Sequence, residues 1–296
     1  MVRPDNGELI LGDADGTLTD GKQRTENQGD PMPISRRNGV DIYYEVAGRG
    51  FPLVMIHAIP FDHRLWTYQA MRFSTWFKCI AVDIRGYGRS AKVTTPFTLR
   101  DMCDDVIGVL EDEGASEAIV MGCSVGSKMA LMLGVDDPMR FKAVVMVGGN
   151  SGPQNQFDRR IKGYREEHLP TYRRGHLEFG VSPTFAKSVM GQYFVGSFME
   201  ATEGLDAEAI ARVFEALTVS DVQPKLPTFR TPSLIINGEF DGALPAGTGT
   251  AALIPESRHV IIKNAGHACN IEQPEAFDAA VMAFLTDNGL MPKRPS

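Results

Sequence analysis

The chain has 296 residues, of which 43% are hydrophobic and 23% are charged, a balance typical of a globular protein with its own apolar core. The formal net charge is −7 at pH 7. Because proteins that bind nucleic acid usually carry the opposite sign, this charge argues against a nucleic-acid partner. The apolar runs are too short to cross a bilayer, and no secretory signal follows Met1, so we expect a cytoplasmic protein without a membrane span.

The cysteines stand singly along the chain. They form no C-x-x-C pair, and no group of histidines has the spacing of metal ligands. A chain of this length can bury a core without disulfides, so we expect reduced, mostly buried cysteines and no structural metal. The four cysteines are Cys79, Cys103, Cys123 and Cys269.

The first part of the chain differs in composition from the rest. Residues 1–33 are rich in Gly, Asp, Thr and Asn and end in a segment with two prolines, which predicts an N-terminal extension. Within it, residues 13–20 resemble the first motif of haloacid-dehalogenase-type phosphatases, in which an aspartate acts beside Mg²⁺. The later strands follow a different pattern, so we interpret this segment as a turn built from Asp and Gly.

An alternation of short apolar runs with helical patterns begins after the extension. Asn38-Gly39 tolerates the positive φ angles of a tight turn, so residues 34–46 are predicted to form a β-hairpin at an antiparallel edge. The alternation predicts an α/β fold with a mostly parallel, eight-stranded sheet flanked by helices. The further predicted strands are residues 51–57, 77–83, 117–122, 141–147, 233–237 and 259–262. The predicted helices between and after them are residues 99–113, 124–135 and 274–285.

The alternation is interrupted between the sixth and seventh strands. Residues 151–229 carry helical patterns without a strand signal. We therefore expect a core made of residues 34–150 and 230–296, with residues 151–229 as a helical insertion.

The segment Gly122–Gly126 matches the pattern G-x-S-x-G, with Ser124 at its centre, between a predicted strand and a predicted helix. A serine on such a turn presents its hydroxyl to substrate, and glycines on either side let the turn close. The helix N-terminus offers N–H donors to a developing oxyanion. The simpler alternative is a glycine-rich turn that only packs a helix on a sheet.

A serine hydroxyl needs a base to become a nucleophile. His267 lies just past the last predicted strand, at the carboxyl edge of the sheet, where ligands bind in open α/β sheets. His57 also ends a strand, but it precedes the nucleophile, and we expect it to make structural hydrogen bonds. The remaining histidines lie in loops, in the insertion or at a strand start: His63, His168, His176 and His259.

The base in turn needs a carboxylate to orient it. Asp241 and Glu239 both follow the strand predicted over residues 233–237. The shorter Asp241, next to a glycine, suits a fixed orienting role better. The chain order serine, acid, histidine also fits, and the sequence predicts a catalytic triad of Ser124, Asp241 and His267.

These motifs together resemble the α/β-hydrolase superfamily over about residues 34–285. Residues 83–90 resemble the family's D-x-R-G-x-G-x-S loop, and Gly266-His267 with residues 272–277 resembles the segment around its catalytic histidine. Residues 57–60 stand where the family has H-G-x-P, with alanine in place of the glycine. The resemblance implies that the backbone N–H groups of Ile59 and Val125 form an oxyanion hole.

The resemblance also indicates the chemistry. Haloalkane dehalogenases and epoxide hydrolases of this superfamily use an aspartate where this chain has Ser124, so acyl transfer fits better. We predict a hydrolase that cleaves a carboxylic ester or lactone of a small, largely apolar substrate through an acyl-enzyme on Ser124, without metal or organic cofactor. Two alternatives stay open: a C–C bond hydrolase acting on a vinylogous diketone with the same triad, and a non-catalytic ligand receptor. The sequence assigns no substrate-binding residue and leaves open whether the chain forms a homo-oligomer.

By the same resemblance, the insertion is expected to act as a lid. Its apolar side chains either line an acyl pocket or hold the lid on the core: Phe185, Met190, Tyr193, Phe194, Phe198 and Met199. Its basic stretch is either a solvated helix face or the source of one arginine that binds a substrate carboxylate. The basic residues are Arg159, Arg160, Lys162, Arg165, Arg173 and Arg174.

Overall fold

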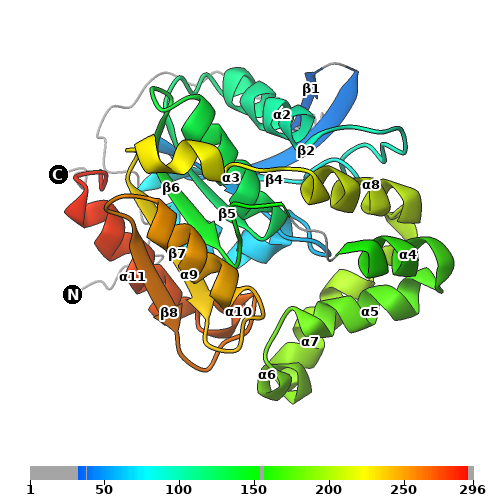
Figure 1. Ribbon diagram of the computed structural model, residues 1–296. Coiled ribbons are helices and arrows are strands. Elements are labelled where there is room, and N and C mark those ends of the chain that lie inside the picture. Colours follow the sequence, from blue (N-terminus) through cyan, green and yellow to red (C-terminus); the bar gives the residue numbers. More distant parts are fainter. Residues whose placement is uncertain (1–32, 38, 154–156, 293–296) are drawn as a thin grey trace, which may run out of the picture. The chain divides into compact units, whose positions relative to one another are not determined.

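The structure is a computed structural model that describes residues 33–37, 39–153 and 157–292. The expected N-terminal extension, with the motif at residues 13–20, lies outside the described residues except for Pro33. Within the described chain, eight strands form one sheet in the order β1-β2-β4-β3-β5-β6-β7-β8 (Figure 1). The pairs β1·β2 and β2·β4 are antiparallel and all other neighbours are parallel, which confirms the predicted sheet.

The strands fall close to the predicted runs. The hairpin is confirmed, because Arg37 pairs with Val40 and Gly39 adopts a φ of 77° at the turn. The strands are β1 Ile34–Arg37, β2 Val40–Ala47, β3 Phe51–Ile56, β4 Phe77–Val82, β5 Ala118–Cys123, β6 Phe141–Val147, β7 Ser233–Gly238 and β8 Arg258–Ile262.

The three predicted helices correspond to α2, α3 and α11. The pattern did not reveal α1 or α9; α9 consists of small and apolar residues that give no polar face to recognise. The helices are α1 Thr67–Phe73, α2 Leu99–Asp112, α3 Val125–Asp136, α4 Asp158–Glu166, α5 Leu169–Phe179, α6 Pro183–Lys187, α7 Val189–Met199, α8 Ala207–Thr218, α9 Leu244–Leu253, α10 Cys269–Glu272 and α11 Pro274–Asp287. None of the helices in the described residues is long and apolar enough to cross a membrane.

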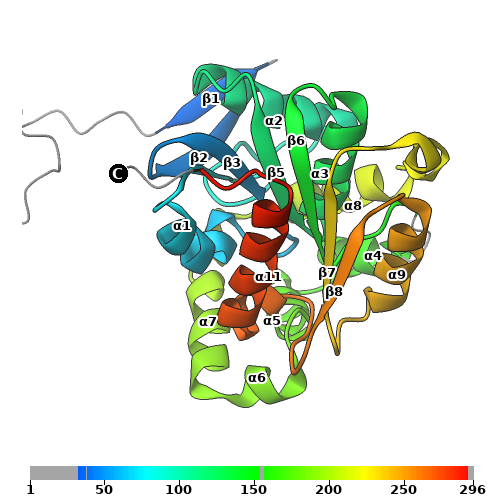
Figure 2. The ribbon, with the colours of Figure 1, turned by 90° about the vertical axis from the view of Figure 1, so that its left-hand side faces the viewer.

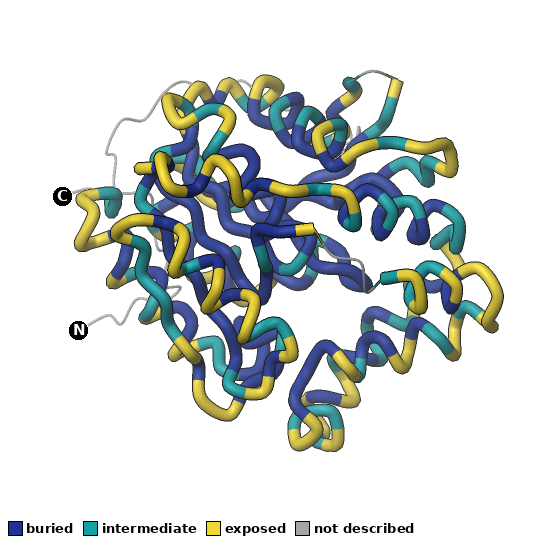
Figure 3. The backbone as a smooth tube through the Cα atoms, in the orientation of Figure 1, coloured by how far each residue is buried: buried dark blue, intermediate teal, exposed yellow. Residues whose placement is uncertain are grey.

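Successive strand residues point to opposite faces of the sheet and pack into two apolar clusters. Val54 and Ile56 of β3 belong to the cluster that includes α2 and α3, whereas Leu53 and Met55 belong to the cluster that includes α1 and α11. Figure 2 shows α1 and α11 on one side of the sheet and α3 and α9 on the other. The strands are buried along most of their length, while the helices expose their outer faces (Figure 3). The four cysteines are free and buried, as expected.

The helical insertion contains α4 to α8 and lies between β6 and β7. Two buried cations attach it to the core. Lys128 of α3 donates to the carbonyl oxygens of Gly152 and Ser220, one on each side of the insertion's helices. Arg173 of α5, which is 1% exposed, donates to the carbonyl oxygen of Pro60 at 3.1 Å and to Thr202 Oγ1 at 2.7 Å. Arg173 therefore belongs neither to a solvated face nor to a ligand site.

Most of the insertion's aromatic residues named from the sequence hold it on the core. Phe194 and Phe198 pack on the ring of Phe61, with ring centroids 5.5 and 5.1 Å apart. Phe185 and Met199 pack against the same cluster, whereas Met190 and Tyr193 are exposed. Of the two alternatives from the sequence, packing on the core therefore applies to Phe185, Phe194, Phe198 and Met199. None of the six residues lines the cavity described below, although α6 reaches that cavity through its first residue, Pro183.

Candidate active site

Ser124 lies on a tight turn between β5 and α3. Its backbone has φ 55° and ψ −113°, in a region that costs a non-glycine residue strain. A Cβ atom at Gly122 would lie 1.9 Å from the carbonyl oxygen of Gly126, and one at Gly126 would lie 2.2 Å from that of Ile56. Only glycine fits at either position, as the sequence pattern predicts. The turn leaves the Ser124 side chain at a cavity instead of in the core.

Two backbone N–H groups near Ser124 are free to donate. Val125 is the first residue of α3, where helix geometry provides no acceptor for the N–H group. Ile59 lies in the loop after β3 and lines the same cavity as Ser124. Across the described residues, neither N–H group donates a backbone hydrogen bond or one to a side chain. Both are therefore available to an oxyanion.

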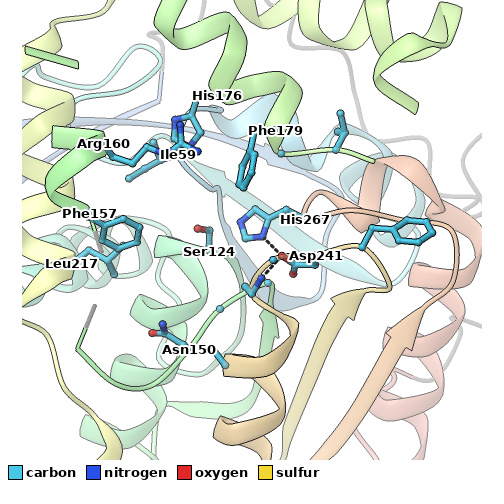
Figure 4. Close-up of a pocket in the computed structure, with 18 of the residues that line it drawn as sticks. Ile59, Ser124, Asn150, Phe157, Arg160, His176, Phe179, Leu217, Asp241 and His267 are labelled. Carbon is cyan, nitrogen blue, oxygen red and sulfur yellow. Dashed lines mark hydrogen bonds and ion pairs between the residues drawn. The ribbon is translucent and has the colours of Figure 1, made fainter. Parts of the chain in front are cut away.

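His267 and Asp241 meet at the carboxyl ends of β7 and β8. His267 Nδ1 lies 2.9 Å from Asp241 Oδ1, and Figure 4 shows this contact beside Ser124. Asp241 is 6% exposed and accepts two further hydrogen bonds, from the N–H group of Ala243 at 2.8 Å and from Asn237 Nδ2 at 3.0 Å. Three donors thus fix the orientation of the carboxylate, and its Oδ1 atom accepts the hydrogen bond from the imidazole.

The two groups shift each other's protonation. Burial alone would raise the pKa of Asp241. The positive charge of His267 and the hydrogen bonds that Asp241 accepts outweigh burial and lower this pKa. Burial alone would lower the pKa of His267, but the charge of Asp241 and the hydrogen bond to it raise this pKa above its ordinary value. Asp241 is ionised at neutral pH and favours the imidazolium form of His267.

A cavity of about 970 Å³ brings the site residues together. Ser124, Asp241, His267 and Ile59 all line it, and Val125 lies buried directly after Ser124. Within the described part of the chain, the Ser124 hydroxyl makes no hydrogen bond, either to His267 or to another group. Catalytic hydrogen bonds often tighten only when substrate binds. The remaining walls include Phe157, Phe179, Phe214, Leu217 and Phe240.

The other strand-end histidine has the structural role expected of it. His57 is fully buried, and its Nδ1 donates to the carbonyl oxygen of Ala58 while its Nε2 accepts from the N–H group of Ile84. Burial lowers the pKa of His57. The ring is a neutral tautomer that ties the loop after β3 to the loop after β4.

Three residues near the site were not assigned a role there from sequence. Asn237 is fully buried at the end of β7, and its Oδ1 accepts from His259 Nε2 at 3.1 Å while its Nδ2 donates to Asp241. A polar residue at a buried strand end is the signal that could have identified it. His176 of α5 and Asn150 after β6 also line the cavity, but no sequence pattern marks them.

A second cluster of ionisable groups lies away from the cavity. Asp62, His63 and Asp83 have ligand-type atoms within 4.8 Å of one another. Asp83 accepts from the N–H groups of His63 and Arg89, and Asp62 pairs with Arg64. Burial would raise the pKa of Asp83, but the hydrogen bond and charge of His63 outweigh it and lower this pKa to about 2. These carboxylates fix the loops after β3 and β4.

Comparisons with known proteins bear on the fold of the chain. The sequence model of the family described as "alpha/beta hydrolase fold" matches residues 52–274. The 3-oxoadipate enol-lactonase 2 of Acinetobacter baylyi is 25% identical over 79% of this chain and 88% of its own length. The pimeloyl-(acyl-carrier protein) methyl ester esterase of Edwardsiella ictaluri is 26% identical over 82% of this chain and 96% of its own length. The crystal structure of the enol-lactonase from Burkholderia xenovorans LB400 superposes with a TM-score of 0.79 at 24% identity, covering 86% of this chain and all of that one.

Proposed function

Because the chain belongs to the α/β-hydrolase fold family, we propose that it is a serine hydrolase that cleaves a carboxylic ester or lactone of a small, largely apolar substrate. Ser124 is the nucleophile, His267 the general base and Asp241 the group that orients the imidazole. The N–H groups of Ile59 and Val125 form the oxyanion hole. The observation that carries the proposal is the 2.9 Å contact between His267 and Asp241 at the cavity that Ser124 lines.

The proposed reaction has two halves. Ser124 Oγ attacks the ester carbonyl while His267 Nε2 takes the hydroxyl proton, and the oxyanion accepts hydrogen bonds from the two backbone N–H groups. His267 then gives this proton to the leaving alkoxide, and the alcohol departs. A water molecule, deprotonated by the same imidazole, hydrolyses the acyl-enzyme and restores Ser124.

The substrate class is supported by the cavity and by the relatives. The aromatic and aliphatic walls suit an apolar acyl or alcohol group. The two relatives described above are named as an enol-lactonase and a methyl ester esterase. Helices α4, α5 and α8 supply part of the cavity wall, and we assign the insertion the role of a lid that excludes water.

The decisive variant is Ser124→Ala, assayed with p-nitrophenyl butanoate. Removing the nucleophile should lower kcat at least about ten-thousandfold. Because the hydroxyl makes no hydrogen bond within the described residues, the melting temperature should stay close to that of the wild-type protein. Turnover retained by a folded Ser124→Ala protein would refute the proposal. Faster turnover of a dienoic vinylogous diketone than of any ester would instead assign the triad to C–C bond cleavage.

A further inference from the structure

The cavity contains an arginine whose charge is not neutralised by the described chain. Arg160 of α4 lines the cavity together with Ser124 and His267. Its guanidinium carbon lies 5.0 Å from the centroid of the Phe179 ring. Among the described residues, the Arg160 side chain forms neither a salt bridge nor a hydrogen bond. Figure 4 shows Arg160, His176 and Phe179 on the insertion's side of Ser124.

The rest of the basic stretch differs from Arg160. Arg165 pairs with Glu208 and Glu215, Lys162 with Glu166, and Arg174 with Glu178. Arg173 is buried in the attachment of the insertion described above. Arg159 is exposed and does not line the cavity. Of the two alternatives from sequence, a solvated face suits most of these residues but does not account for Arg160.

The other charged groups of the cavity already have partners. Lys128 donates to the carbonyl oxygens of Gly152 and Ser220. Asp241 accepts from His267, Asn237 and Ala243. Glu178 lies 3.8 Å from Arg174. An anion that enters the cavity therefore finds one guanidinium whose N–H groups are not in use.

We propose that Arg160 binds a free carboxylate of the substrate, so that the substrate is a monoester or a lactone that keeps a second, ionised carboxyl group. This inference rests on the proposed function and narrows its substrate class. A guanidinium that stacks on an aromatic ring contacts the ring with its flat face. The N–H groups at the edge of the guanidinium remain available to a carboxylate that accepts two hydrogen bonds. Among the described residues of the cavity, Lys128 already donates to two carbonyl oxygens, so the one unpaired guanidinium matches a single negative charge, whereas a phosphate would bring up to two.

The stacking on Phe179 makes the proposed contact specific. It holds the guanidinium at the cavity wall before substrate arrives, so that less side-chain entropy is lost on binding. A lysine at this position would keep the charge but not the planar fork or the stacking.

The test compares two esters of equal acyl length, mono-p-nitrophenyl adipate and p-nitrophenyl hexanoate, which differ only in a terminal carboxylate against a methyl group. The quantity measured is the ratio of their kcat/KM values, corrected for spontaneous hydrolysis. The wild-type protein should favour the adipate ester. Arg160→Gln should lower the ratio at least about tenfold, since removing one partner of a charged hydrogen bond typically costs that much or more. Arg160→Lys should give an intermediate ratio.

The matched control is Arg159→Gln, one residue earlier on the same helix and outside the cavity, which should leave both kcat/KM values as in the wild-type protein. A ratio unchanged by Arg160→Gln, or lowered equally by Arg159→Gln, would overturn the inference while ester hydrolysis itself stands.

A binding measurement separates this inference from the proposed function. Calorimetric titration of the Ser124→Ala protein with monomethyl adipate and with methyl hexanoate needs no turnover. Tighter binding of the adipate ester, lost in Ser124→Ala/Arg160→Gln, supports carboxylate recognition even if the wild-type protein hydrolyses no ester. Equal affinity for the two esters, or equal affinity of the two proteins for the adipate ester, overturns it.

Discussion

The edge of the sheet and the helical insertion build the same cavity in different ways. At the sheet edge, Asp241 is 6% exposed and accepts three hydrogen bonds, and Ser124 is held by a turn that requires glycine at positions 122 and 126. In the insertion, Phe179 is 69% exposed and Arg160 has no ionic partner within the described chain. The groups proposed for the chemistry are thus held by hydrogen bonds within the protein, whereas the guanidinium proposed for selectivity is held only by stacking on Phe179 and keeps its N–H groups for the substrate.

The largest expected effect lies at the sheet edge. Asp241→Asn keeps the shape of the side chain but removes the charge and disturbs the tautomer of His267. We expect kcat to fall about a thousandfold to ten-thousandfold for every ester tested, because the imidazole can no longer act as base in the required orientation. Steady-state kinetics with a short and a long p-nitrophenyl ester would measure this. A loss confined to one ester would contradict this expectation, since it would give Asp241 a role in selectivity.

The kcat/KM values should depend on pH through the protonation of His267. The neutral form of His267 is the base. Burial lowers the pKa of His267, but the charge and hydrogen bond of Asp241 outweigh burial and raise this pKa above its ordinary value. Activity should therefore be full above this pKa and fall about tenfold per pH unit below it, with the midpoint above about 6.5. Asp241→Asn removes the raising charge, so the residual activity should show its midpoint at lower pH. A midpoint that does not move would contradict this account of His267.

A smaller effect is expected at Asn237, which contacts the triad through Asp241. Asn237→Ala removes a hydrogen bond from Asp241 and leaves His259 without its acceptor. We expect kcat to fall about tenfold and the free energy of unfolding to fall by about 1–3 kcal/mol. His259→Ala is the control, because it leaves the bond between Asn237 and Asp241 in place and should reduce kcat less than Asn237→Ala does. Equal losses of kcat in the two variants would show that Asn237 does not act through Asp241.

The smallest effect is expected on the outer surface of the insertion. Tyr193 is 73% exposed and does not line the cavity. Tyr193→Ser should leave kcat/KM within about twofold for both short and long esters, since exposed substitutions away from special features change little. A selective loss with the long ester would mean that α7 reaches the acyl group after all.

The sequence predicted the sheet edge better than the insertion for a physical reason. Strands of a parallel sheet bring their carboxyl ends to one edge, so strand order and strand ends alone bring Ser124, Asp241 and His267 to one cavity. A helical pattern shows which face is apolar but not what that face contacts. Phe194 and Phe198 thus pack on the core instead of the cavity, and Arg160 could not be told from Arg159. Asn237 was missed because its contact with His259 joins two strands that are far apart in the sequence.

The proposed reaction depends on activation of the Ser124 hydroxyl by His267. The most direct test is to treat the protein with an alkyl fluorophosphonate, locate the adduct by peptide mass spectrometry and measure its rate of formation in the wild-type and His267→Ala proteins. We predict a single phosphonyl group on Ser124, formed at least about a thousandfold more slowly when His267 is absent. An adduct on another residue, or equally fast labelling of Ser124 in the two proteins, would contradict the account.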